Sequence, residues 1–300
     1  MNFTPLTISD FQTLLPFFTR QPYELCPYLL SSMIAWRSDS CESFKATFGD
    51  DLIIRGRMKD FQFLYLPISS MDHFPPQRLR ELVEAAGVDT VFPVPDQYIK
   101  HFGEEQVASF FSIKEKPEHS DYVYRMEDLA KLKGNLYSKK RNLINQFKRN
   151  YLRNERVEIA PITPSDTSGC IDFLEEWCLS NDCDAGDRNE LACEKQAAIF
   201  TLEHQEDFGV TGLLLRIDGE ICAFGIGTRL TQNMGVLNYE KAFADIKGLY
   251  QFFDRECARR MFPGFEYINK ENDMGEPGLR KAKKSYYPVR IVIAYELTVR

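Results

Sequence analysis

The sequence predicts an α+β protein made of two similar units, each a mixed, mostly antiparallel sheet flanked by helices. Three observations support this prediction. The 300 residues suffice for two domains, and 44% hydrophobic with 27% charged residues is typical of a chain with a packed core. Both halves contain helical apolar spacing and short strand-like runs. These runs follow a similar order in the two halves, which favours a tandem duplication.

The first unit is expected to comprise residues 1–120. Ser9 and Asp10 are good helix-capping residues, and apolar residues recur at helical spacing after them. Pro75 and Pro76 are expected to open another helix, because proline is tolerated in a first turn. The predicted elements are helices after Asp10 and over 28–36, hairpin strands over 51–55 and 61–68, a helix from 76, and a strand over 90–94.

The second unit is expected to comprise residues 157–300. Asp218 and Gly219 lie between two apolar runs, and this pair is typical of a tight hairpin because both residues tolerate positive φ. The predicted elements are a strand over 157–162, helices after Asp166 and over 189–206, strands over 210–217, 220–228 and 234–240, a helix over 248–261, a strand over 265–268, a helix over 278–284 and a strand over 289–299. The GNAT (acyl-CoA N-acyltransferase) fold has this order.

Residues 121–156 are predicted to form a connecting region with a basic amphipathic helix. Between 131 and 156 the one acidic residue is Glu155. The bases there are Lys131, Lys133, Lys139, Lys140, Arg141, Lys148, Arg149, Arg153 and Arg156. Because the whole chain carries a net charge of −7, contact with nucleic acid or anionic lipid would need such a local basic surface. The alternative is a strut between the units with a solvated charged face.

The eight cysteines include no CxxC pair, which is typical of reduced thiols in a cytosolic protein. Cys178, Cys183 and Cys193 lie close together, but no histidine lies among them, so no metal site is predicted. The first residues lack the pattern of a signal peptide, and no window reaches the ~20 apolar residues of a membrane span. We therefore expect a cytoplasmic location and no integral membrane segment.

Two segments resemble the C-terminal domain family of phosphatidylglycerol lysyltransferases. One is residues 134–142, GNLYSKKRN, followed by Phe147. The other is the longer and more specific run over 269–283, NKENDMGEPGLRKAK, which ends in Ser-Tyr-Tyr-Pro at 285–288. The resemblance implies a pair of GNAT-like domains. It also implies transfer of an aminoacyl group from a charged tRNA to an amine or hydroxyl acceptor, with a lipid head group as one candidate.

Aminoacyl transfer requires an oriented ester, a stabilised oxyanion and a base for the incoming nucleophile. Arg280 and Lys283 lie three residues apart on a short predicted helix, so they are candidates for a cationic pair that holds a phosphate or an oxyanion. Glu271 and Asp273 follow a predicted strand and are candidate bases or amine ligands. Glu240, at the end of another strand, is a further candidate base. The alternatives are a solvated helix face and acids that interact with a helix N-terminus.

Substrate or phosphate contacts are expected from the basic helix and from the second motif. The candidates are Lys139, Lys140, Arg141, Asn145, Lys148, Asn269 and Tyr286.

The loop that binds the pyrophosphate of acetyl-CoA in the GNAT fold has the pattern Gln or Arg, two residues, Gly, one residue, Gly or Ala. In the matching run over 245–250, only Gly248 fits. Asp245 would repel a pyrophosphate, and Tyr250 would crowd the helix N-terminus that binds it, although Lys247 partly offsets this. Aminoacyl-tRNA is therefore expected as the donor in preference to acetyl-CoA. An acyl-CoA-dependent N-acyltransferase and a non-catalytic binding module are the alternatives.

Overall fold

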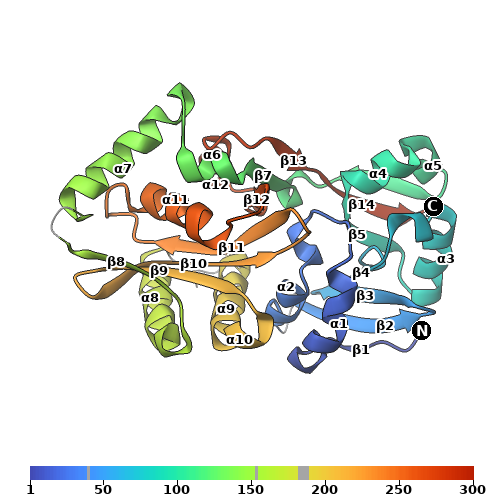
Figure 1. Cartoon of the computed structure of the whole chain (residues 1–300). Helices are drawn as coiled ribbons and strands as arrows, with labels where there is room; N and C mark the ends of the chain where they lie inside the picture. Colours follow the sequence, from blue (N-terminus) through green and yellow to red (C-terminus); the bar gives the residue numbers. More distant parts are fainter. Residues whose placement is uncertain (39–40, 153–154, 182–188) are drawn as a thin grey trace.

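The computed structural model describes residues 1–38, 41–152, 155–181 and 189–300. Within these residues the chain forms two seven-stranded mixed sheets flanked by helices (Figure 1). This confirms the predicted α+β class. None of the helices in the described ranges has both the length and the hydropathy needed to cross a membrane.

The first sheet has the strand order β1-β2-β3-β4-β5-β14-β6. β4 and β5 pair in parallel, and the other neighbours pair antiparallel. Its strands are β1 Thr4–Pro5, β2 Cys41–Phe48, β3 Asp51–Met58, β4 Phe61–Leu64, β5 Thr90–Pro95, β6 Phe111–Glu115 and β14 Ala294–Val299. Its helices are α1 Phe11–Phe18, α2 Leu30–Ala35, α3 Pro76–Ala86, α4 Asp96–Phe102 and α5 Glu104–Ala108.

The second sheet has the order β13-β7-β12-β11-β10-β9-β8, and β11 and β12 pair in parallel. Its strands are β7 Asp121–Arg125, β8 Val157–Pro161, β9 Thr211–Ile217, β10 Glu220–Arg229, β11 Met234–Ala242, β12 Tyr267–Asn269 and β13 Arg290–Val292. Its helices are α6 Met126–Lys131, α7 Ser138–Asn150, α8 Thr167–Ser180, α9 Asn189–Glu203, α10 Gln205–Phe208, α11 Leu249–Met261 and α12 Pro277–Lys284.

The two sheets have the same plan and exchange one strand. Strands β1 to β6 of the first sheet correspond in position to β8 to β13 of the second. The strand next to the edge is β14 in the first sheet and β7 in the second, so each sheet takes this strand from the other half of the chain. Leu297 of β14 pairs with Val91 and Ile113, and Val123 of β7 pairs with Asn269 and Arg290.

Because of this exchange, the sheets do not follow the predicted boundaries at 120 and 156. The segment 121–125, assigned from sequence to the connecting region, is a strand inside the second sheet. The single strand predicted over 289–299 is two strands, β13 and β14, which lie in different sheets. The run over 289–299 is strand-like throughout, with no turn residue to mark the point at which the chain leaves one sheet for the other.

Local sequence signals account well for several elements. Asp218 and Gly219 both have positive φ, +53° and +93°, which confirms the predicted hairpin between β9 and β10. Helix α3 begins at Pro76 and ends at Ala86, and the left-handed backbone of the following Gly87 terminates the helix. By contrast, β2, α4, α5 and β6 were not predicted.

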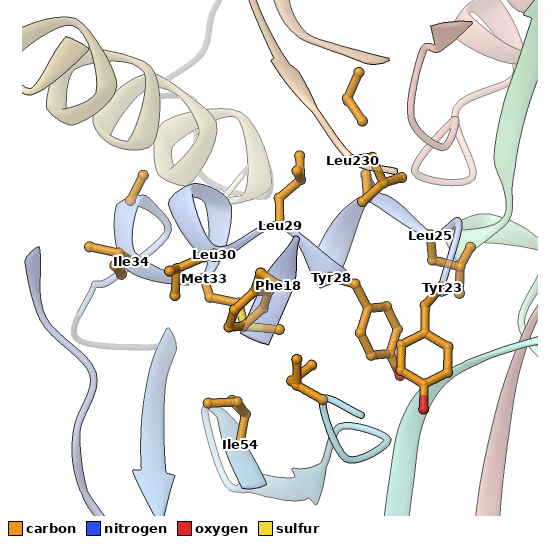
Figure 2. Close-up of a cluster of buried hydrophobic side chains, with 14 of the residues drawn as sticks. Phe18, Tyr23, Leu25, Tyr28, Leu29, Leu30, Met33, Ile34, Ile54 and Leu230 are labelled. Atoms are coloured by element: carbon orange, nitrogen blue, oxygen red, sulfur yellow. The ribbon is translucent and has the colours of Figure 1, made fainter. Parts of the chain in front are cut away.

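Buried apolar side chains join the two halves of the chain. Helices α8 and α9 cover one face of the second sheet, and α6, α7 and α11 cover the other (Figure 1). The core on the α8 and α9 side continues into the first half. Leu230, the residue after β10, belongs to the same buried cluster as Leu25, Leu29 and Tyr28 (Figure 2). The halves therefore share a core and fix the position of the residues between them.

Candidate active site

The candidate site lies where the parallel strands β11 and β12 separate. These strands pair over three residues, ending at Val236 and Asn269. Just beyond, two residues of β11 contact the residues that follow β12. Asn238 contacts Glu271, and Glu240 contacts Lys270. Lys270 reaches Asp254 of α11 on one face of the sheet, whereas Glu271 lies near Glu194 of α9 on the other face.

Glu271 is held in a conformation that few residues adopt. Its φ is +59°, in the left-handed region that is unfavourable for a residue with a β-carbon. The Asn269 side-chain oxygen accepts the Glu271 amide at 2.6 Å, and the Glu271 carbonyl accepts the Tyr122 amide at 3.1 Å and Lys283 Nζ at 3.3 Å. The carboxylate accepts a hydrogen bond from Asn238 Nδ2 at 3.2 Å. Such local strain, held by several contacts, is common at functional sites.

Burial and a neighbouring carboxylate raise the pKa of Glu271. Burial is the larger cause, the charge of Asp121 adds to it, and Lys283 opposes both, so that the pKa reaches about 8. Asp121 is fully buried and accepts hydrogen bonds from the Cys26 amide at 2.6 Å and from Asn269 Nδ2 at 2.8 Å. Glu271 can therefore take up or release a proton near neutral pH.

Lys283 reaches from α12 into the backbone of the same loop. Its Nζ donates hydrogen bonds to the carbonyl oxygens of Lys270 and Glu271. Burial lowers the pKa of Lys283, while the negative charge of Glu271 opposes this effect. Lys283 thus holds the loop through two backbone contacts, and it lies close enough to the Glu271 carboxyl group for each to shift the pKa of the other.

Arg280 was predicted to form a cationic pair with Lys283 on α12, but it binds Asp273 instead. The Asp273 carboxylate is 1% exposed and accepts hydrogen bonds from Arg280 Nε at 2.7 Å, Arg280 Nη2 at 3.1 Å, the Tyr122 hydroxyl at 2.6 Å and the Gly275 amide at 3.0 Å. Burial alone would raise the pKa of Asp273, but the hydrogen bonds from Arg280 and Tyr122 outweigh it and hold the pKa below its usual range. With its oxygens occupied, Asp273 is better placed to fix the loop than to accept a substrate proton.

On the opposite side of the sheet, Lys270 lies between two carboxylates. Its Nζ is 2.9 Å from Glu240 Oε2 and 2.6 Å from Asp254 Oδ1 of α11. Burial raises the pKa of Glu240, the charge of Asp254 raises it further, and Lys270 opposes them, which leaves the pKa at about 7. Burial would lower the pKa of Lys270, but the two carboxylates raise it well above its usual range. Lys270 is therefore charged, and Glu240 can exchange a proton near neutral pH.

The basic helix α7 reaches this side of the site through Lys140. Its Nζ lies 3.8 Å from the ring centroid of Tyr286 and donates a hydrogen bond to Ser285 Oγ at 2.7 Å. Lys270 lies 5.4 Å from the same ring centroid. The aromatic ring of Tyr286 thus contacts both the basic helix and the buried ion pairs.

The other predicted contacts on α7 have different surroundings. Lys139 and Asn145 are exposed. Arg141 Nη1 donates to the carbonyl oxygens of Leu132 and Gly134 at 2.6 and 2.5 Å, so this side chain braces the turn that precedes the helix. Arg153, together with Cys183 of the cysteine group, lies outside the described residues.

Gly248 is required by the packing of α7 against α11. Its φ is +84°, and a β-carbon there would lie 2.2 Å from the carbonyl oxygen of Leu143 in α7. Lys247 and Asp245 are exposed, and the Tyr250 hydroxyl accepts a hydrogen bond from Trp177 Nε1 at 3.2 Å. The close helix contact is a sufficient reason for glycine at this position.

A cleft of about 530 Å³ opens between the two halves beside the site. It is lined by Thr19, Arg20, Gln21, Pro22, Glu24, Thr231, Gln232 and Asn233. Glu24 links this cleft to the site, because its carbonyl oxygen accepts Asn269 Nδ2 at 2.9 Å and its carboxylate binds Arg290 at 2.6 Å.

Several residues of the site were not identified from the sequence. Asp254 had a local signal, since it is an acid among the buried Phe252, Phe253 and Cys257 of α11. Asp121 had none, because it reaches Asn269 only through the exchange of β7 into the second sheet.

Similarity to known proteins identifies the family of this chain. The family model described as phosphatidylglycerol lysyltransferase, C-terminal, matches residues 28–295. A crystal structure of a conserved protein of unknown function from Bacteroides thetaiotaomicron is 29% identical, with a TM-score of 0.89 and coverage of 100% of both chains. The C-terminal domain of a protein assigned as a lysylphosphatidylglycerol synthetase, from Agrobacterium fabrum, shares the fold at 14% identity, with a TM-score of 0.63 and coverage of 97% of this chain and 91% of that one. No curated protein matches the chain. The chain belongs to the phosphatidylglycerol lysyltransferase C-terminal family.

Proposed function

We propose that this chain moves an aminoacyl group from a charged tRNA to an amine or hydroxyl acceptor at the gap between β11 and β12. The observation that carries the proposal is the state of Glu271, a buried carboxyl group with a pKa of about 8 in a loop held by Asn269 and Lys283. A base is most effective when its pKa lies near the working pH. Membership of the lysyltransferase family supports an acyl-transfer role.

In the proposed step, the acceptor nitrogen or oxygen attacks the ester carbonyl carbon of the aminoacyl group. A new bond forms between the acceptor and this carbon, and the bond from the carbon to the ribose oxygen breaks. Glu271 takes the acceptor proton and returns it to the departing ribose oxygen. Lys283, whose charge favours the ionised form of Glu271, helps to keep the base available.

The two sides of the sheet suit the two substrates. On the α7 side, Lys140 of this base-rich helix contacts the ring of Tyr286 beside the gap, and this favours a polyanionic donor. On the other side, the cleft is lined by Glu24, whose carbonyl oxygen binds Asn269 next to Glu271, and we assign the acceptor to this cleft. A phospholipid head group and a small amine are both candidates for the acceptor.

The test is transfer of label from a mixed pool of labelled aminoacyl-tRNA into a cell extract that is then separated into lipid and water-soluble fractions. We expect transfer by the unmodified protein, and a loss of at least ~100-fold for Glu271→Gln, since general bases contribute about 10²–10⁴-fold. Glu266→Gln, which alters an exposed carboxylate near the same strand, is the matched control and should retain full activity. Transfer from acyl-CoA but not from aminoacyl-tRNA would overturn the proposed donor. No transfer by correctly folded protein would overturn the proposal.

A further inference from the structure

Helices α7 and α11 lie side by side and run in the same direction. The Leu143 carbonyl contacts Gly248 near the start of the contact, and the rings of Phe147 and Phe252 stack with centroids 4.8 Å apart further along. One residue after Phe147 comes Lys148, and three residues after Phe252 comes Arg255. The outer part of this helix pair therefore brings basic residues of both helices together.

Positive charge exceeds negative charge in this cluster. Three arginines of α11 share one carboxylate in the described structure, that of Glu256. It accepts hydrogen bonds from Arg255 at 3.0 Å, Arg259 at 3.4 Å and Arg260 at 3.2 Å. Lys148 adds a fourth cation without a partner of its own among the described side chains. Burial, followed by the charge of Arg255, lowers the pKa of Lys148, as expected for cations on neighbouring helices.

Arg255 also carries an unused donor. Its side chain is 14% exposed, and its Nε is buried with no hydrogen-bond partner in the part of the chain that the structure describes. Buried polar groups in folded proteins nearly always have a partner. A buried guanidinium N–H within an excess of positive charge is a donor suited to an anion.

We infer that Lys148, Arg255 and Arg259 form a binding site for phosphate groups of a nucleic-acid backbone. This inference rests on the proposed function and assigns to tRNA a contact away from the reacting ester. Lys140 and Lys148 are eight residues apart on α7, about 12 Å at 1.5 Å per residue. The basic residues thus extend from the gap between the strands to the cluster, and such a span suits an extended polyanion better than a single free phosphate.

The test measures the affinity for an unfractionated, uncharged tRNA pool as a function of salt concentration. Lys148→Gln and Arg259→Gln are suitable variants, because Lys148 is partly exposed and Arg259 is 53% exposed, so both proteins should fold. Lys114→Gln removes the same charge from an exposed position of β6 in the other sheet and is the matched control. We expect each test variant to bind about 3- to 10-fold more weakly, and its log–log salt slope to be smaller by ~0.7–0.9 per lost phosphate contact. The control should bind as the unmodified protein does.

Wild-type affinity and slope in both test variants would overturn the inference. So would a selective loss of binding to vesicles of anionic phospholipid with tRNA binding unchanged, because the cluster would then serve a membrane. Glu271→Gln separates the two proposals, since it should bind tRNA normally. tRNA binding that depends on Lys148 in a protein without transfer activity would support the site and refute the proposed function. Transfer activity together with tRNA binding that does not depend on Lys148 would support the proposed function and refute the phosphate-binding site.

Discussion

Glu271 and Glu240 lie on opposite sides of the gap between β11 and β12, and both are buried carboxyl groups with raised pKa values. Burial is the main cause for each, and a nearby aspartate adds to it. Their protonation near neutral pH therefore depends on the fold around them and not on their local sequence.

If Glu271 is the base, the rate of transfer should follow its ionisation. The ionised form becomes more abundant as pH rises, so kcat/KM should increase between pH 6 and 9 with a midpoint near 8. Glu271→Gln should remove this rise and leave a low, flat profile. The measurement is kcat/KM for transfer across this pH range, with Glu266→Gln as the control. An unchanged midpoint in Glu271→Gln would assign the titration to another group.

Asp254 should be important for stability, because it neutralises a buried cation. Asp254→Asn leaves Lys270 with Glu240 as its remaining carboxylate partner. We expect a loss of about 2–3 kcal/mol in the free energy of unfolding, less than the ~3–5 kcal/mol for removing the sole partner of a buried charge. Urea denaturation at pH 7 measures this. Asp218→Asn, which alters an exposed pair with Arg156, should change stability little. Equal stability of the two variants would show that Asp254 is not needed to balance Lys270.

At the scale of elements, the contact between α7 and α11 depends on one glycine. In Gly248→Ala the new β-carbon would lie 2.2 Å from a backbone oxygen of α7, so the helix would have to move. Gly87→Ala is a matched control, because Gly87 also has positive φ, +72°, but open space around it. We expect the free energy of unfolding to fall by about 1–2 kcal/mol in the control, because of the left-handed backbone alone. In Gly248→Ala we expect it to fall by at least ~3 kcal/mol.

Thermal or urea unfolding of both variants tests this expectation. Similar losses in the two would mean that α7 can shift without cost. Because α7 also carries Lys140 and Lys148, a shift of the helix in Gly248→Ala should weaken tRNA binding as well.

At the scale of the whole molecule, the strand exchange makes each half dependent on the other. A fragment of residues 157–300 would lack β7, which lies between β12 and β13, and a fragment of residues 1–120 would lack β14, which lies between β5 and β6. Each sheet would lose an interior strand and expose unpaired backbone groups.

We therefore expect neither fragment to fold alone. Circular dichroism with urea titration should show no cooperative transition for 157–300, whereas the full chain should unfold cooperatively. Mixing 1–156 with 157–300 should restore a cooperative transition, since together they supply all fourteen strands of the described structure. Cooperative unfolding of the isolated fragment 157–300 would contradict this expectation.

The site also contains residues of both halves. Glu24 and Cys26 from the first half bind Asn269 and Asp121, which hold Glu271 in place. The first half therefore contributes to the site even though its own sheet lies away from the gap.

The sequence by itself determined the features that depend on neighbouring residues. The α+β class, the hairpin at Asp218 and Gly219 and the start of α3 at Pro76 followed from local patterns, and the run over 269–283 carried the resemblance to the family. Only the tertiary structure decided which sheet β7 and β14 join, why Gly248 is a glycine, and which groups surround Glu271. These features depend on contacts between residues far apart in the chain. Neither of the two contacting segments has a periodic sequence pattern that identifies its partner.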